Sequence, residues 1–180
     1  YLVSAFIIST LASIAAGILL YRLVQLDFSR ATAGLAVWFL FIFPTSYFLH
    51  IGYTESLFLM LALGCVLAAR TGRWVPAGLL GALACLTRAT GLVLVPALLV
   101  EAGHQYWTTR RFNWRWLTVA IVPMGFGGYL LLNYHAAGDP FAFLPIRKEF
   151  YHISLAPPWT GVREAIGSLN RTPAQAQIVG

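Results

Sequence analysis

Long apolar runs dominate this chain and indicate helices that span a membrane. Residues 1–21 and residues 116–138 contain no charged side chain at all. A helix rises about 1.5 Å per residue, so about 20 apolar residues cross a hydrocarbon core of about 30 Å. Residues 57–63 are all apolar and do not alternate with polar residues, as a strand of a membrane barrel would. The pattern therefore predicts helices, which satisfy their own backbone hydrogen bonds in lipid.

Six candidate spans follow from this pattern, and two of them are short. Residues 75–87 and 91–107 are either two separate segments or, as an alternative, one 26-residue helix over residues 75–100 with Arg88 inside it. The fold class predicted is all-α, a polytopic transmembrane helical bundle with about five to six spans. The six candidates cover residues 2–21, 31–50, 54–69, 75–87, 91–107 and 116–134.

Seven arginines flank the candidate spans and favour the two-segment interpretation. If residues 75–87 and 91–107 are two passes or a deep helical hairpin, all seven arginines fall on one side of the membrane. If they are one pass, the last three fall on the other side. Because basic residues concentrate in cytoplasmic loops, we predict two segments and a cytoplasmic location for these arginines. They are Arg22, Arg30, Arg70, Arg73, Arg110, Arg111 and Arg115.

The composition narrows the class of protein further. The 180 residues are 59% hydrophobic and 10% charged, whereas soluble domains carry about 25% charged residues. A soluble domain of this size could not bury so much apolar surface, which excludes an ordinary cytosolic enzyme and a disordered tail. The net charge of +6 does not indicate a nucleic-acid partner, because seven of the twelve basic residues flank the spans. The partner expected is the lipid bilayer.

The composition changes once, at a Gly-Asp-Pro sequence over residues 138–140 that is typical of a turn. The residues beyond it are more polar. We therefore expect a transmembrane helical core over residues 1–137 and an extracytoplasmic tail segment over residues 138–180. The chain begins at Tyr1 inside an apolar run, so we expect it to be a fragment of a longer protein.

Glu55 is the most informative single residue. It lies between two predicted spans, and an ionisable group at membrane depth usually faces a polar cavity or a partner. Its carboxylate could serve acid–base chemistry. The structural alternative is a first-turn acid that complements the helix dipole, with Thr54 as the N-cap. Thr45, His50 and Tyr53 surround the same turn; each alone suits a structural role, but together with Glu55 they could bind sugar hydroxyls.

Arg88 is the second candidate, because it interrupts an apolar run and is predicted on the same side of the membrane as Glu55. A guanidinium binds phosphate or carboxylate well, and the alternative is a snorkelling or ion-paired structural arginine. Asp139 is a third candidate on that side, although turn chemistry alone explains it. The histidines and cysteines lack metal-ligand spacing, so neither a metal nor a cofactor is expected.

Three motifs, taken together, resemble a known family. They are Phe-Pro-Thr-Ser-Tyr-Phe at 43–48, Tyr-Thr-Glu-Ser-Leu-Phe at 53–58 and Leu-Thr-Arg-Ala-Thr-Gly at 86–91. In this order and spacing they resemble the PIG-V type of mannosyltransferase, the GPI mannosyltransferase 2-like group. Gly-Asp-Pro-Phe-Ala-Phe at 138–143 resembles a segment that follows these helices in such proteins. The resemblance covers about residues 30–160.

The resemblance implies the glycosyltransferase C fold and an integral membrane enzyme of the bacterial plasma membrane or the endoplasmic reticulum. Such an enzyme transfers a hexose, here mannose, from a polyprenyl-phosphate-linked donor to a glycan or glycolipid acceptor on the extracytoplasmic face. The usual catalytic acid of this superfamily lies in a loop near the N-terminus. The resemblance therefore implies that the principal acid lies upstream of Tyr1. Glu55 is then a candidate catalytic residue, but Glu55 and Arg88 are more securely assigned to lining the site.

Two other functions fit the same sequence features. A polytopic transporter or flippase could use Glu55 and Arg88 to line a substrate path. A non-catalytic subunit of a glycosylation complex would also be a helical membrane protein.

Overall fold

The computed structural model describes residues 2–49, 51 and 54–141, and over these residues the chain is helical with no strand. The all-α prediction is therefore confirmed for the described part of the chain. Each predicted span coincides with one α-helix, in three cases extended by a short 3-10 helix. The elements are α1 (Leu2–Val24), α2 (Arg30–Ile42), η1 (Pro44–Leu49), α3 (Glu55–Arg70), α4 (Trp74–Thr87), η2 (Ala89–Val93), α5 (Leu94–Thr109), η3 (Trp114–Ala120) and α6 (Ile121–Ala137).

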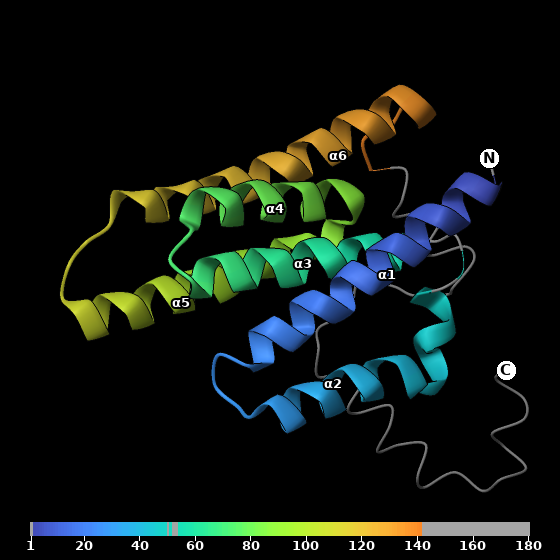
Figure 1. The fold of residues 1–180 in the computed structure, drawn as a ribbon. Helices are drawn as coiled ribbons and strands as arrows, with labels where there is room; N and C mark the ends of the chain where they lie inside the picture. The colour runs from blue at the N-terminus through green and yellow to red at the C-terminus, as the bar shows by residue number, and fades with distance from the viewer. Residues whose placement is uncertain (1, 50, 52–53, 142–180) are drawn as a thin grey trace, which may run out of the picture.

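The helices alternate in direction, so their connections gather at two opposite ends of the molecule (Figure 1). The loops after α1, α3 and α5 lie together at what we call the arginine-rich end, because all seven span-flanking arginines belong to these loops or to the residues beside them. The start of α3 and the ends of α4 and α6 lie at the opposite end, which we call the Glu55 end.

Small residues let the central helices approach closely. Helix α3 packs between α1 and α4, and α4 packs on α6. The buried positions of α4 are mainly Ala, Gly and Cys. A Cβ atom at Gly125 of α6 would overlap the carbonyl oxygen of Ala82 in α4. Close backbone contact through small residues is the packing mode of helices in membranes, where lipid is as apolar as leucine.

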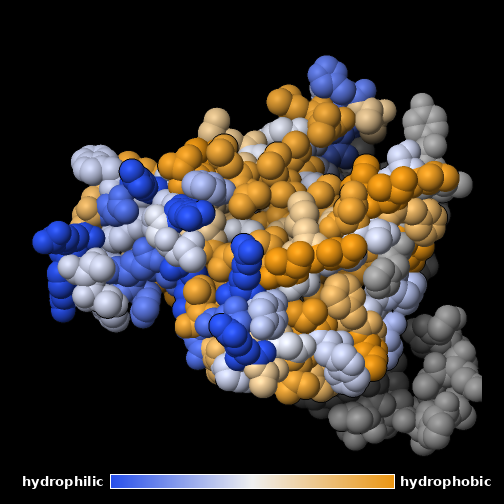
Figure 2. Space-filling view, viewed as in Figure 1, coloured by the Kyte–Doolittle hydropathy of each residue, from blue (hydrophilic) through white to orange (hydrophobic). Residues whose placement is uncertain are grey.

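The outer surface is correspondingly apolar. Trp38 and Phe39 of α2, and Leu99 and Val100 of α5, are each more than half exposed. Hydrophobic residues cover the helices on the face shown in Figure 2, and hydrophilic residues gather at the arginine-rich end. Soluble monomers rarely expose apolar patches of this extent. Such a surface is consistent with helices that lie in a membrane.

Two helices of the described residues are long and apolar enough to cross a bilayer: Val3–Val24 with 22 residues and Trp114–Ala137 with 24. Arg30–Ile42 and Trp74–Thr87 are apolar but shorter. A 13-residue helix such as α2 reaches only about 20 Å at 1.5 Å per residue. The total of five to six passes therefore stays a prediction.

The span predicted over residues 31–50 is not one continuous helix. Helix α2 begins after Ser29, whose side chain accepts a hydrogen bond from the backbone N–H of Thr32, and it ends at Ile42. Phe43 is extended, with φ −61° and ψ 138°. Pro44 explains this break, because proline disfavours helical geometry in the residue before it. The chain continues as the 3-10 helix η1, which turns toward α3.

The alternative of one helix over residues 75–100 is wrong. Helix α4 ends at Thr87, and Arg88 is extended, with φ −152° and ψ 138°. The chain then folds back as η2, where Gly91 is buried and a Cβ there would lie 2.7 Å from the Cα of Cys85. Only glycine allows this close return of the chain onto α4. Arg88 is thus placed in a tight break between two helices, as the two-segment interpretation predicts.

Candidate functional site at the Glu55 end

Two buried serines of α1 hold the segment that leads into Glu55. The Ser13 hydroxyl donates to the carbonyl oxygen of Leu49 at 2.6 Å, and the Ser9 hydroxyl donates to that of Ile51 at 2.9 Å. Ser9 also shares a 3.0 Å hydrogen bond with Ser56, the second residue of α3. Both serines are 2% exposed, so these bonds are shielded from competing solvent. They fix the start of α3, and with it the position of Glu55.

Glu55 is the first residue of α3, as the first-turn interpretation predicts. Thr54 occupies the N-cap position, and its carbonyl oxygen accepts from the N–H of Phe58 at 2.9 Å. The predicted N-cap position of Thr54 is confirmed, but its side chain makes no capping hydrogen bond. Thr54 has helical φ and ψ values, −80° and −3°, rather than the extended ones that aim an N-cap side chain at the helix.

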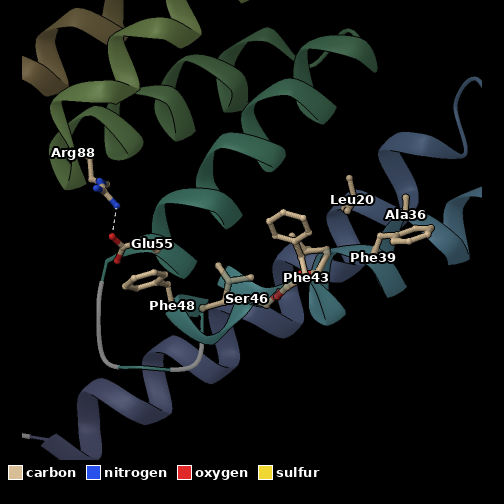
Figure 3. Close-up of a pocket in the computed structure, with 10 residues that line it drawn as sticks. Leu20, Ala36, Phe39, Phe43, Ser46, Phe48, Glu55 and Arg88 are labelled. Carbon is tan, nitrogen blue, oxygen red and sulfur yellow. Dashed lines mark hydrogen bonds and ion pairs between the residues drawn. The ribbon is translucent and has the colours of Figure 1, made fainter. Parts of the chain in front are cut away.

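Arg88 and Glu55 form an ion pair across the gap between α4 and α3. The Arg88 Nη1 donates to the Glu55 Oε1 at 2.5 Å, and Figure 3 shows the two side chains facing each other. Each side chain is 32% exposed, so the pair lies at the edge of the bundle rather than in its core. The structural alternative for Arg88, an ion-paired arginine, is therefore confirmed.

The Arg88–Glu55 ion pair leaves hydrogen-bonding groups of both side chains without a described partner. The second carboxylate oxygen of Glu55, Oε2, is buried and has no hydrogen-bond partner among the described residues. Within the same residues, one hydrogen bond occupies the Arg88 guanidinium, which carries five N–H donors. A buried acceptor without a partner is costly in a finished structure, so such a group calls for an explanation. A bound polar ligand would supply one.

A groove of about 710 Å³ opens beside the pair. Its lining runs from Glu55 and Arg88 past Phe48 and Ser46 to apolar residues of α2 and α1 (Figure 3). The Ser46 hydroxyl is turned away into local backbone bonds, to the carbonyl oxygens of Leu40 and Phe43. One end of the groove is thus charged and the rest is apolar. The lining residues are Leu20, Ala36, Phe39, Leu40, Phe43, Ser46, Phe48, Leu49, Glu55 and Arg88.

The structure brings two of the six predicted site residues together, namely Glu55 and Arg88. Asp139 follows α6 at the same end of the molecule but does not line the groove, and its Oδ1 accepts from the N–H of Phe141 at 2.8 Å, as its turn predicts. Thr45 belongs to η1, but its side chain lies outside the described set. His50 and Tyr53 lie outside the described residues, so their predicted roles stay predictions.

Sequence reasoning missed the serines that position the site. Ser9 and Ser13 are four residues apart, which places both on one face of α1. Paired hydroxyls on one face of an otherwise apolar helix are a detectable sign of a polar contact in a membrane protein. No group of three or more His, Cys, Asp or Glu side chains suited to a metal ion occurs among the described residues.

Comparison with family models identifies the family of this chain. The family model described as mannosyltransferase (PIG-V) matches residues 1–133, which is most of the chain. The chain belongs to the PIG-V mannosyltransferase family. Membership makes it a membrane glycosyltransferase of the mannosyltransferase type, and the matched region contains both Glu55 and Arg88. No match was found among curated proteins or solved structures.

Proposed function

We propose that this PIG-V chain forms the lipid-donor site of a multi-pass hexosyltransferase. The enzyme transfers mannose from a polyprenyl-phosphate-linked donor to a glycan or glycolipid acceptor on the extracytoplasmic face. The observation that carries the proposal is an unsaturated Arg88–Glu55 pair at the charged end of an otherwise apolar groove. A phosphate joined to a long apolar chain matches both parts of this groove.

Arg88 is proposed to bind the donor phosphate. In the reaction the bond between the sugar's anomeric carbon and a phosphate oxygen breaks, and its electron pair stays on the lipid phosphate. The negative charge of the leaving group therefore grows in the transition state. A guanidinium fixed in advance by Glu55 stabilises that charge without having to reorganise. Its remaining N–H donors suit the oxygens of a phosphate, which arginine binds in a bidentate manner.

Glu55 is proposed to line the sugar and acceptor side of the same site. Its Oε1 holds Arg88, and its buried Oε2, which has no described partner, is proposed to accept a hydrogen bond from a substrate hydroxyl group. The attacking hydroxyl of the acceptor bonds to the anomeric carbon and gives up its proton. A carboxylate oxygen at this point can orient that hydroxyl or accept its proton. The predicted contribution of Thr45, His50 and Tyr53 would be made to the same hydroxyl-rich ligands.

The apolar part of the groove is proposed to hold the first isoprene units of the donor. Phe39 and Phe43 from the end of α2 lie on this path with Leu20 of α1 (Figure 3). These large apolar side chains would contact a branched hydrocarbon chain. The groove opens at the outer surface of the bundle, so a lipid could enter from the membrane.

The arrangement suits a transferase better than a transporter. Substrate sites of secondary transporters lie near the bilayer midplane, between helices broken at mid-length. Glu55 instead begins α3 and Arg88 follows the end of α4, so the pair lies at one end of its helices. A lipid-linked sugar has its polar group at the membrane surface, where such a site meets it. Family membership supports the same choice.

The arginine-rich end is proposed to face the cytoplasm and the Glu55 end the opposite side. Cysteine introduced at Arg111 of an otherwise unchanged full-length protein tests this orientation in sealed cells. We expect a membrane-impermeant thiol reagent to label it only after the membrane is opened. Labelling from outside in intact cells would reverse the orientation.

The function is tested with purified full-length protein and two radiolabelled donors, polyprenyl-phosphate mannose and nucleotide-linked mannose. We expect sugar transfer to an acceptor from the lipid donor alone, and a loss of about tenfold or more in Glu55→Gln. Glu101→Gln, which neutralises an acid at the opposite end, is the matched control and should stay near wild type. Two outcomes would refute the proposal. One is transfer from the nucleotide-linked donor, and the other is no transfer from either donor or from any other lipid-linked hexose.

A further inference from the structure

A second groove lies at the arginine-rich end, away from the Glu55–Arg88 site. It has a volume of about 870 Å³ and is formed by α1, α3 and α4, which are neighbours in the bundle (Figure 1). The proposed transfer reaction makes no use of it. Its walls are apolar along most of their length, and its mouth is polar and basic, so its chemistry is that of a site for an amphipathic anion.

The apolar part of this groove is lined by aliphatic side chains that pack around a glycine of α3. Gly64 lies in the middle of α3, and a Cβ there would lie 3.2 Å from a methyl carbon of Leu80 and 3.6 Å from one of Leu19. The missing side chain therefore lets these two leucines pack close to the α3 backbone, and the three residues line the groove together. Met60 and Leu67 extend the same wall along α3 by about one turn in each direction. A hydrocarbon chain fits such a channel, since no polar side chain is described along it.

The mouth of the groove is lined by two arginines, Arg22 in the last turn of α1 and Arg73 just before α4. Both are exposed, and neither forms an ion pair with any described residue. Their neighbour Arg70 differs, because it is paired with Asp27 at 2.7 Å and lies 3.7 Å from Glu101. The described acids at this end are thus engaged by Arg70, and the mouth keeps the charge of two unpaired guanidinium groups.

We propose that this groove binds an anionic phospholipid of the surrounding bilayer. The phosphate lies between Arg22 and Arg73, and one acyl chain lies along Gly64 and Leu80. Basic pockets between membrane helices at the level of the headgroups are suited to such lipids, because the guanidinium groups meet phosphate while the chain stays in an apolar slot. The groove is at the opposite end from Arg88, so the lipid is distinct from the sugar donor.

The proposal is tested on full-length protein purified in detergent, with phosphatidylglycerol and phosphatidylcholine of identical acyl chains as probes. Native mass spectrometry measures how much of each lipid stays bound. We expect phosphatidylglycerol to be retained at least several-fold better by wild-type protein, and this preference to vanish in Arg22→Gln/Arg73→Gln. The matched control Arg111→Gln/Arg115→Gln removes the same charge at the same end but outside the groove, and should keep the preference.

Two results would overturn the proposal. One is an unchanged preference in the Arg22/Arg73 double variant. The other is an equal loss in both double variants, which would mean that overall charge rather than the groove selects the lipid. If the double variant does not fold, photo-crosslinking of wild-type protein with a phosphatidylglycerol that carries a diazirine in its acyl chain gives an independent answer. Crosslinks to Met60, Leu67 or Leu80 support the site, and crosslinks confined to other helices refute it.

A competition experiment separates the two possible sources of a lipid phosphate. Polyprenyl phosphate added to the phosphatidylglycerol complex should leave the bound phosphatidylglycerol in place, because the two lipids occupy opposite ends of the bundle. Displacement at equal concentrations would assign the groove to the substrate lipid and overturn the proposal. Sugar transfer by the Arg22/Arg73 variant in detergent should stay close to wild type, so failure of this site is distinguishable from failure of the transferase assignment.

Discussion

The two ends of the bundle use the same residue types in different ways. At the arginine-rich end, Gln105 of α5 accepts from the buried Trp74 Nε1 at 3.1 Å and donates to the Ala69 carbonyl oxygen and to Glu101, at 2.9 and 2.8 Å. Arg70 contacts the other oxygen of Glu101 and so completes the network. At the Glu55 end, by contrast, one oxygen of a charged carboxylate has no described partner. The other buried side-chain atom without one, the Trp116 Nε1, is uncharged and lies outside the Gln105 network.

Under the proposed function, this difference separates structural polar groups from those that bind substrate. A buried polar network whose members are all satisfied rigidifies the fold and leaves nothing to bind a ligand. An unsatisfied pair beside a groove contributes less to stability and keeps hydrogen-bonding capacity for a substrate. We therefore expect substitutions at the Glu55 end to affect activity more than stability, and substitutions in the Gln105 network to do the reverse.

The largest effect on activity is expected for Arg88→Ala. Loss of a preorganised donor to a developing anion typically costs about 100-fold or more in rate, and Arg88→Lys, which keeps the charge but not the planar fork, should be intermediate. Initial rates of mannose transfer from the lipid donor measure this, with Arg111→Ala as the control. A rate close to wild type, or a melting temperature that falls as far as that of Gln105→Leu, would make Arg88 a structural arginine like Arg70.

Ser13→Ala is expected to have the next largest effect on activity. It removes the hydroxyl that binds the Leu49 carbonyl oxygen and so loosens the segment that leads into Glu55. Small displacements of positioning groups are costly for catalysis, and we expect transfer to fall by roughly tenfold. The matched control is Thr10→Ala, because Thr10 is exposed and its described hydroxyl bond, to the Phe6 carbonyl oxygen, lies within α1. Equal rates for the two variants would show that the serines support the fold alone.

Gln105→Leu should change stability and spare the chemistry. The substitution leaves the Trp74 N–H unpaired in the core, where a lost partner costs about 1–3 kcal/mol. We expect a lower melting temperature in detergent and a transfer rate within about twofold of wild type at low temperature, since stability is lost far from the reacting groups. Gln25→Leu, at the same end but without a described side-chain hydrogen bond, should melt like wild type. A large loss of transfer in folded Gln105→Leu would contradict the inference that the Gln105 network supports stability and not activity.

The sequence predicted the helices far better than the contacts between their ends. Charge-free runs longer than about 20 residues leave few alternatives to a helix in lipid, which is why α1 and α6 were placed correctly. Proline disfavours helical geometry in the residue before it, so Pro44 alone could have predicted the end of α2. The span over residues 31–50 was instead drawn from hydropathy, which is continuous across the break. The Arg88–Glu55 pair joins residues 33 positions apart, and no local pattern specifies which of several charged residues will meet.

The missed network at the arginine-rich end has a similar cause. Asp27, Glu101 and Gln105 each resemble ordinary solvated residues that flank a membrane span. Glu101 and Gln105 lie one turn apart on α5, but only the packing of α3 against α1 and α5 brings Arg70 to Asp27 and Glu101. Composition therefore located the charges along the chain, but the fold decided which were satisfied. That distinction separates the proposed site residues Glu55 and Arg88 from the Gln105 network, and periodicity could not supply it because periodicity gives no measure of hydrogen-bond satisfaction.

The smallest effect on stability is expected for Arg70→Gln, although Arg70 forms ion pairs with two acids, Asp27 and Glu101. Its partner Asp27 is 46% exposed and Arg70 itself 33%, so water and salt screen the pair. Exposed ion pairs contribute about 0–1 kcal/mol, and the hydrogen bonds of Gln105 remain when Arg70 is replaced. Melting in detergent at low and high salt measures the difference: the variant should lie close to wild type, and closer still at high salt. A loss as large as that of Gln105→Leu would show that the charges, and not the buried amide, hold the arginine-rich end together.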